Sequence, residues 1–147
     1  MLLTERSAAA LSVAVLAVGF AVGGMMQPWA SAQAQSGTRV FELRTYTTHE
    51  GKLPNLNARF RDHTARIFER HGMTNIAYWT PEDAPDSANT LIYVLAHASR
   101  EAAKKSWATF RADPEWQKVR QESRGDGPIV SKVESVFMSA TDYSPLQ

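Results

Sequence analysis

Apolar and polar residues are arranged along the chain in a way that predicts four β-strands. Residues 39–46 alternate apolar and polar side chains, which is typical of a strand with one buried face. Residues 90–96 are apolar on both faces, which predicts a strand buried on both sides. Two more strands are expected over residues 73–79 and 129–138, bounded by turn-forming proline and glycine.

Two further segments repeat apolar residues at three- and four-residue steps, and this spacing predicts amphipathic helices. The inward stripe of the first helix is expected to be Leu53, Leu56, Phe60, His63 and Ile67. This helix should end at Gly72, because glycine readily adopts the left-handed conformation that closes a helix. The second helix begins after the capping residue Ser99 and reaches Phe110, and a short helix restarts at Asp113-Pro114.

The elements follow the order β-α-β-β-α-β, which predicts an α+β fold. A ferredoxin-like arrangement satisfies this order most simply, with an antiparallel sheet and two helices on one face. On the first strand, Phe41 and Leu43 are expected to face the helices. The open face is then expected to carry Val40, Glu42, Arg44, Tyr46, Val130, Lys132, Glu134, Val136 and Met138.

Charged residues of the open face are expected to pair across the sheet, Glu42 and Arg44 with Lys132 and Glu134. A mixture of paired charges and apolar residues suits a two-fold interface. A domain of this size also buries only part of its surface when it is alone. We therefore expect a homodimer through the open sheet face, in which two sheets close into a barrel.

The first 34 residues have the layout of an export signal. Residues 8–26 contain no charged side chain, and the small residues at positions 30, 32 and 34 suit cleavage by a signal peptidase. We expect a signal peptide over residues 1–34, a short flexible lead over 35–38 and one domain over 39–147, in a periplasmic or secreted protein. The alternative is an uncleaved anchor, because the apolar run approaches the length that spans a bilayer. A membrane location is expected only in that case.

Composition excludes several kinds of chemistry. The 147 residues contain no cysteine, so disulfides, thiolate metal sites and a cysteine nucleophile are excluded. A formal net charge of +1 gives no reason to expect nucleic-acid binding. The four histidines, His49, His63, His71 and His97, do not have a metal-binding spacing. A glycine-rich phosphate loop is missing too, so neither a metal nor a cofactor is expected.

Several short motifs occur in an order that resembles the NIPSNAP family of the dimeric α/β-barrel superfamily. They are residues 41–46, 51–53, 59–64, 71–73, 78–79, 106–107, 113–116, 132–135 and 141–143. The resemblance implies a homodimeric barrel and little about a reaction, because many bacterial members have no settled chemistry. Some relatives in the superfamily hold haem through a histidine, which leaves haem at His63 as a minor alternative. The mitochondrial roles of eukaryotic relatives are not carried over to a chain with an export leader.

His63 is the candidate general acid or base. Its place on the inward stripe predicts a buried imidazole, which can take or give a proton near neutral pH. Arg44 and Tyr46 are candidates for orienting a substrate, Arg44 by contacting an anionic group or a carbonyl oxygen. The alternatives are a hydrogen-bonded core histidine and a cross-strand salt bridge.

Aromatic residues are numerous enough to form the wall of a pocket. The candidate ligand-binding residues are Thr45, Tyr78, Trp79, Trp107 and Trp116. The alternative is that the rings serve core packing alone.

The first helix also carries basic residues, which we interpret as a solvated helix face. They are Arg59, Arg61, Arg66 and Arg70. Asp62 is expected to pair with Arg66 four residues on, which would leave no basic patch for a partner.

Two functional hypotheses follow. The first is an exported homodimeric domain that binds a small hydrophobic organic molecule in an aromatic-walled pocket and acts on it, if at all, without a cofactor. The second is a non-catalytic protein-interaction module of the cell envelope. An enclosed cavity of about 300 Å³ or more favours the first hypothesis, whereas a filled interior favours the second.

Overall fold

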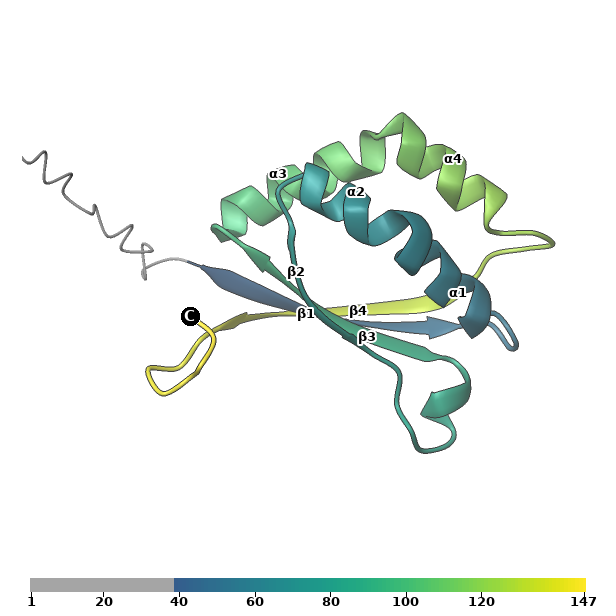
Figure 1. The fold of residues 1–147 in the computed structure, drawn as a ribbon, viewed down its shortest axis with the longest axis horizontal. Coiled ribbons are helices and arrows are strands. Elements are labelled where there is room, and N and C mark those ends of the chain that lie inside the picture. Colours follow the sequence, from purple (N-terminus) through teal and green to yellow (C-terminus); the bar gives the residue numbers. More distant parts are fainter. Residues whose placement is uncertain (1–38) are drawn as a thin grey trace, which may run out of the picture. The chain divides into compact units, whose positions relative to one another are not determined.

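A four-stranded antiparallel sheet forms one layer of the domain, with its strands in the order β2-β3-β1-β4 (Figure 1). The computed structural model describes residues 39–147, so the predicted signal peptide and lead lie outside the described residues. The strands are β1 (Val40–Thr48), β2 (Thr74–Trp79), β3 (Thr90–His97) and β4 (Val130–Ser139). Both β3 and β4 pair with β1, which is therefore a central strand.

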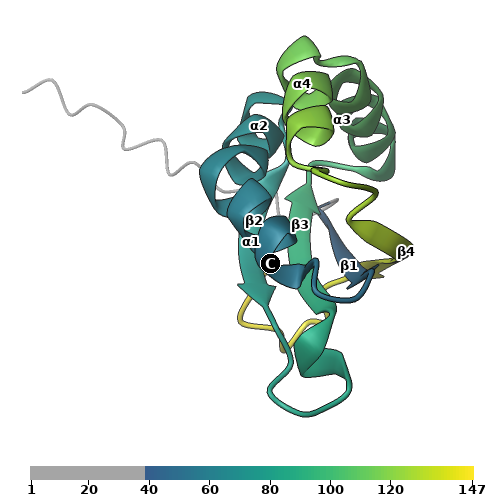
Figure 2. The same ribbon diagram turned by 90° about the vertical axis from the view of Figure 1, so that its right-hand side faces the viewer.

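Helices cover one face of this sheet in two rows that lie side by side (Figure 2). The first row is α1 (Leu53–Arg59), a π-helical turn (Phe60–Thr64) and α2 (Ala65–Arg70). The second row is α3 (Arg100–Ala112) and α4 (Pro114–Glu122), and a 3-10 turn (Asp86–Ala88) lies between β2 and β3. This arrangement confirms the predicted α+β, ferredoxin-like fold. Within residues 39–147, no helix has both the length and the apolar character that crossing a bilayer requires.

The predicted helix boundaries have identifiable capping interactions. The Ser99 hydroxyl accepts a hydrogen bond from the Ala102 amide at 3.1 Å, which caps α3. The Asp113 carboxylate accepts from the Glu115 and Trp116 amides at 2.8 and 3.2 Å, which caps α4. Gly72 follows α2 with a φ of +76°, so the predicted glycine stop is confirmed.

The two faces of β1 are opposite to the prediction. Leu43 pairs with Val94 and Val136 on the open face of the sheet, where 55% of Val136 is exposed. Glu42 and Tyr46 face the helices instead: Trp107 of α3 donates a hydrogen bond to the Glu42 carboxylate. Alternation separates two sets of side chains but does not say which set meets the helices. The polar set lies inside because neighbouring elements supply hydrogen-bond donors for it.

The predicted salt bridges across the open face are also wrong. Arg44 pairs with Glu42 of its own strand, with 2.6 Å between the guanidinium and the carboxylate. Lys132 pairs at 3.0 Å with Glu134, two residues along β4. The register between β1 and β4 shifts near the end of the pairing, where Val130 lies opposite Thr48. This irregularity moves Val130 from the predicted open face to the helix side.

Buried apolar side chains fill the space between the helices and the sheet. The core consists of Leu53, Leu56, Phe60, Ile67, Phe68, Met73, Leu91, Tyr93, Leu95, Phe110 and Ile129. The Tyr93 ring is fully buried, and its centroid lies 5.1 Å from that of Phe60 and 5.4 Å from that of Tyr78. The partly buried rings of Tyr46, Tyr78, Trp107 and Trp116 pack against this core. These aromatic residues therefore contribute to core packing.

The π-helical turn corrects the predicted inward stripe of the first helix. The Ala65 amide donates to the carbonyl oxygen of Phe60, five residues earlier, so this turn contains one more residue than an α-helical turn. The extra residue rotates Thr64 into the core and leaves His63 exposed. The expectation of a buried His63 was wrong because a uniform 3.6-residue period was assumed.

Gly72 provides a test of the helix stop. Replacing Gly72 with alanine should lower the free energy of unfolding by about 1–2 kcal/mol, because a side chain disfavours the left-handed conformation. The new Cβ would lie 3.7 Å from the Ser106 hydroxyl, so the loss would come from the backbone and not from a clash. Gly127→Ala is the matched control, since Gly127 has no positive φ and open space around it. Urea denaturation curves measure both changes, and equal effects would contradict the assignment.

Candidate functional site

The carboxylate of Glu42 is the most densely hydrogen-bonded group beside the site. Only 1% of this residue is exposed. One oxygen accepts from His97 Nε2 at 3.0 Å and Trp107 Nε1 at 2.7 Å. The other accepts from Arg44 at 2.6 Å and the Ser135 hydroxyl at 2.7 Å. The four donors come from β3, α3, β1 and β4, so one side chain connects the sheet to the second helical row.

These hydrogen bonds determine the charge of Glu42. Burial by itself would raise the pKa of Glu42, but the donors from His97, Ser135, Trp107 and Arg44 outweigh it and lower the pKa to about 2. Glu42 is therefore an anion at neutral pH. This charge neutralises Arg44, which is the nearest cation.

Arg44 lies between two aromatic rings. Its guanidinium carbon is 4.2 Å from the centroid of the Trp107 ring and 5.5 Å from that of Tyr46. One nitrogen also donates to the Tyr46 hydroxyl over a long distance of 3.4 Å. Arg44 is thus fixed in position, with its charge balanced by Glu42 on one side.

A cavity of about 410 Å³ opens beside Arg44, between the helices and strands β1 and β4. Five arginines line it: Arg44, Arg59, Arg111, Arg120 and Arg124. Five aromatic rings line it as well: Tyr46, Phe68, Trp107, Phe110 and Trp116. Among the described residues, no aspartate or glutamate is part of this lining. We call this cavity the arginine cleft.

The aromatic wall of the arginine cleft is a continuous series of packed rings. Trp116 packs on Phe110 with 4.5 Å between the ring centroids, and Phe110 lies 4.8 Å from Phe68. Phe68 meets Trp107 edge to face at 5.4 Å. Each ring packs against the next one, so the wall is a rigid apolar surface.

Arg59 lies at the end of α1, next to the π-helical turn. Only 7% of the residue is exposed, and its single hydrogen bond is a long one of 3.4 Å to the Ser123 hydroxyl. Its guanidinium carbon lies 5.4 Å from the Trp116 ring centroid. Burial, together with repulsion from Arg120 and Arg124, lowers the pKa of Arg59 below its ordinary value. The prediction that Arg59 belongs to a solvated face was wrong.

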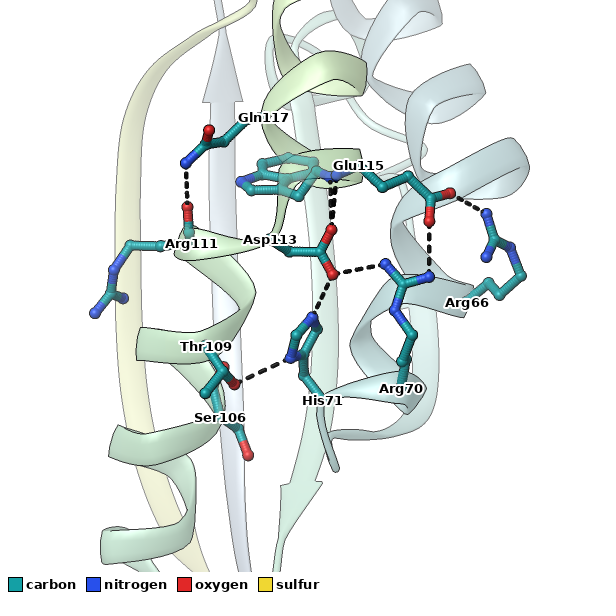
Figure 3. A network of polar contacts seen from close by, with 10 residues as sticks. Arg66, Arg70, His71, Ser106, Thr109, Arg111, Asp113, Glu115 and Gln117 are labelled. Carbon is teal, nitrogen blue, oxygen red and sulfur yellow. Dashed lines mark hydrogen bonds and ion pairs between the residues drawn. The ribbon is translucent and has the colours of Figure 1, made fainter.

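A polar network joins α2 to the α3–α4 junction (Figure 3). Arg70 contacts the carboxylates of Asp113 and Glu115 at 2.6 and 2.7 Å, and Arg66 also pairs with Glu115. His71 bridges the Thr109 hydroxyl at 3.0 Å and Asp113 at 2.7 Å. Hydrogen bonds from His71 and Arg70 lower the pKa of Asp113.

This network corrects the predicted partner of Arg66. The structure pairs Arg66 with Glu115 of α4 and not with Asp62 of its own helix. The prediction considered only neighbours within one helix, whereas the carboxylates that Arg66 and Arg70 contact come from the second helical row. The ion pairs hold the two rows together at this end of the domain.

The structure brings four of the eight predicted site residues together. The arginine cleft is lined by Arg44, Tyr46, Trp107 and Trp116. The other four lie elsewhere. His63 lies in an outer groove with Asp62 and Glu122, which shares Arg59 with the cleft. His63 itself does not line the cleft, so the geometric support for it as a general acid or base there is lost.

Three predicted wall residues also point away from the cleft. Thr45 of β1 and Trp79 of β2 both lie opposite Ile92 of β3, which is between those strands. All three side chains are on the open face of the sheet. Tyr78 is on the helix side, where its hydroxyl donates to Asn75 and its ring lines a smaller hollow beside Phe60. A strand prediction identified these residues but could not assign them to one pocket.

The sequence analysis missed four of the arginines that line the cleft, namely Arg59, Arg111, Arg120 and Arg124. One signal was present in the chain: Trp116, Arg120 and Arg124 follow one another at four-residue steps, which places them near one face. Arg59, three residues after Leu56, also falls on the apolar stripe of α1. Basic residues on an apolar stripe are a reason to expect an internal charge.

The sheet, its helical cover and a ligand-sized cleft define this domain as one with the subunit fold of dimeric α/β barrels. Residues 41–145 match the NIPSNAP family model, and the chain belongs to the NIPSNAP family. None of the curated proteins matches it significantly. Within residues 39–147, no three His, Asp or Glu side chains are grouped so that they could share a metal ion.

Solved structures agree with this assignment. A NIPSNAP family protein of Agrobacterium tumefaciens superposes with a TM-score of 0.65 at 24% identity, covering 75% of this chain and 95% of its own. A NIPSNAP-like domain protein of Burkholderia xenovorans gives 0.63 at 18% identity, covering 73% and 89%. SnoaB, a cofactor-independent oxygenase of Streptomyces nogalater, gives 0.50 at 16% identity, covering 74% and 99%. At these identities the likeness establishes the fold.

Acid titration tests the role of Glu42. The lowered pKa in the folded state means that the Glu42 hydrogen bonds contribute stability in full above pH 4.5, and that this stability is lost as the pH falls toward about 2. The urea midpoint of the protein should therefore decrease over this range. Glu42→Gln should be less stable at neutral pH and should lose part of this pH dependence. Parallel curves for the two proteins would show that Glu42 does not hold the folded state.

Proposed function

We propose that this NIPSNAP domain binds a small organic molecule in the arginine cleft. The observation that carries the proposal is the cavity itself: about 410 Å³, walled by packed aromatic rings and bounded by a few fixed polar groups. Pockets for small molecules have this size and this combination of apolar walls and convergent polar groups. A filled interior would have favoured the protein-interaction module, so the cavity supports the small-molecule hypothesis over it.

The proposal includes a homodimer formed through the open sheet face. Large apolar side chains are exposed there: 52% of Trp79, 55% of Val136 and 36% of Met138. Half-buried Ile92 and Val94 lie between them in the sheet. Covering such a face with a second copy removes apolar surface from water, and two-fold pairing of one patch with itself is the commonest way to do so.

The leader at residues 1–34 supports an exported protein, periplasmic or secreted. In this proposal the domain meets its ligand outside the cytoplasm. The support is the sequence layout alone, since these residues lie outside the described part of the chain.

Turnover of the ligand is the enzymatic form of the proposal. SnoaB is described as a cofactor-independent oxygenase, and its fold is shared by this domain. In this form, Arg44 and Tyr46 orient the substrate from β1 while the rings of Trp107 and Trp116 enclose it. Because His63 lies outside the cleft, any proton transfer would require the Tyr46 hydroxyl or a group of the substrate itself.

A neutral fluorescent probe tests the proposed pocket. N-phenyl-1-naphthylamine should bind with saturable fluorescence gain at one site per subunit. Trp116→Ala should weaken this binding about tenfold, because the stacking surface of the wall is removed. Trp79→Ala is the matched control, since Trp79 lies on the opposite face of the sheet. Absence of saturable binding of this probe, and of the charged naphthyl probes described below, to the unmodified protein would contradict the proposed function.

The dimer proposal has its own test on β4. Val136→Arg should convert the dimer into a monomer, because it places a charge among the exposed apolar side chains of the open face. Val133→Arg is the control on the same strand, since Val133 is similarly exposed but lines the arginine cleft on the other face. Native mass spectrometry or light scattering measures the mass. A monomeric unmodified protein, or a Val136→Arg variant that stays dimeric, would remove this interface.

A further inference from the structure

The charges around the arginine cleft are not balanced. Its lining contains five arginines and, within residues 39–147, no acidic side chain. Glu42 balances Arg44 from behind the lining. The remaining four, Arg59, Arg111, Arg120 and Arg124, form no ion pair with any described carboxylate. A cavity with such an excess of positive charge attracts anions.

The burial of Arg59 makes this imbalance costly. Arg111, Arg120 and Arg124 are exposed, so water solvates them, whereas only 7% of Arg59 is exposed. The Nε of Arg59 is buried without a hydrogen-bond partner. A buried charge without a counter-ion is strongly destabilising, and most proteins avoid it by pairing the charge.

A comparison along the same helical row strengthens the point. Arg66 and Arg70 are substantially exposed and need a partner least, yet both are paired with carboxylates of the second row (Figure 3). Arg59 is far more buried than either, and within residues 39–147 it forms no ion pair. Glu122, which borders the outer groove beside Arg59, pairs with Lys118 instead. Asp62 borders this groove too, yet among the described residues neither carboxylate forms an ion pair with Arg59.

The surroundings of Arg59 also define the rest of a ligand. The Trp116 ring lies 5.4 Å from its guanidinium carbon and continues into the packed aromatic wall. Arg120 and Arg124 are near enough to repel the charge of Arg59. An oxyanion at this end of the cleft would contact Arg59 and reduce that repulsion, while a flat ring attached to it would lie along the wall.

We infer that the ligand of the arginine cleft is a flat aromatic molecule with an oxyanion, a carboxylate or a phosphate ester, that serves as the counter-ion of Arg59. This inference rests on the proposed function and specifies its ligand class. The planar guanidinium suits both oxyanions, because each offers two oxygens to its parallel N–H groups. The aromatic wall selects the flat part of the molecule, and Arg59 selects its charge.

Matched probes test the inference on the unmodified protein. Isothermal titration calorimetry at low ionic strength would compare 2-naphthoate, 2-naphthyl phosphate and the uncharged 2-naphthamide, which share one ring system. Both anions should bind at least tenfold more tightly than the amide. The tighter of the two anions identifies the carboxylate or the phosphate ester as the preferred oxyanion.

Arg59→Met tests whether Arg59 is responsible for the preference for anions, with Arg61→Met as the matched control. Arg61 is exposed on the same helical row and does not line the cleft. Arg59→Met should reduce the preference for 2-naphthoate over the amide several-fold, with the remainder supplied by the exposed arginines of the cleft, whereas Arg61→Met should keep it in full. Without ligand, Arg59→Met should also raise the melting temperature, because it removes an unpaired buried charge. A purely structural Arg59 would produce a lower melting temperature instead.

Failure of the inference and failure of the proposed function give different results. Saturable binding of the amide with the same affinity as the anions would leave the pocket in place and overturn the charge selection. No binding of any naphthyl probe or of N-phenyl-1-naphthylamine would overturn both. An unchanged preference for anions in a folded Arg59→Met protein would remove Arg59 as the counter-ion site.

Discussion

The buried carboxylate of Glu42 is the interaction on which the rest of the structure depends. Its four hydrogen bonds join three strands of the sheet to α3, and they hold its charge in the interior. An unpaired buried charge is costly, so these donors decide which face of β1 meets the helices. The same bonds fix Arg44 and Trp107 at the edge of the cleft. One acidic residue thus connects the orientation of the sheet to the polarity of the candidate site.

The arginines of the domain differ in whether they form ion pairs with carboxylates. Between the two helical rows, Arg66, Arg70 and His71 contact carboxylates at the α3–α4 junction. These contacts hold the rows together. In the cleft, Arg59 is buried and forms no ion pair within residues 39–147, although Asp62 and Glu122 border the adjoining groove. This difference is why we propose an anionic ligand, and not a structural role alone, for Arg59.

Much of the fold was predictable, because it depends on local patterns. Alternation predicted the strands, and three- to four-residue spacing predicted the helices. Ser99 and Asp113 predicted where two helices begin, and Gly72 predicted where the first helix ends. The site was predicted less well. Arg44 and Trp107 lie together in the cleft as expected. His63 does not, because the π-helical turn that contains it changes the helical period and turns its side chain outward. The local sequence pattern does not predict that a single helical turn contains an additional residue.

By itself, the sequence determined the order of the elements, the ferredoxin-like topology and the membership of the NIPSNAP family, since these follow from local periodicity and from motifs in a fixed order. Only the tertiary structure decided which face of β1 is internal, which partner Arg66 takes and that Arg59 is buried without an ion pair to any described carboxylate. Each of these depends on side chains that are distant in sequence and close in space. Pairing and burial are properties of such neighbours, so a reading along the chain could not assign them.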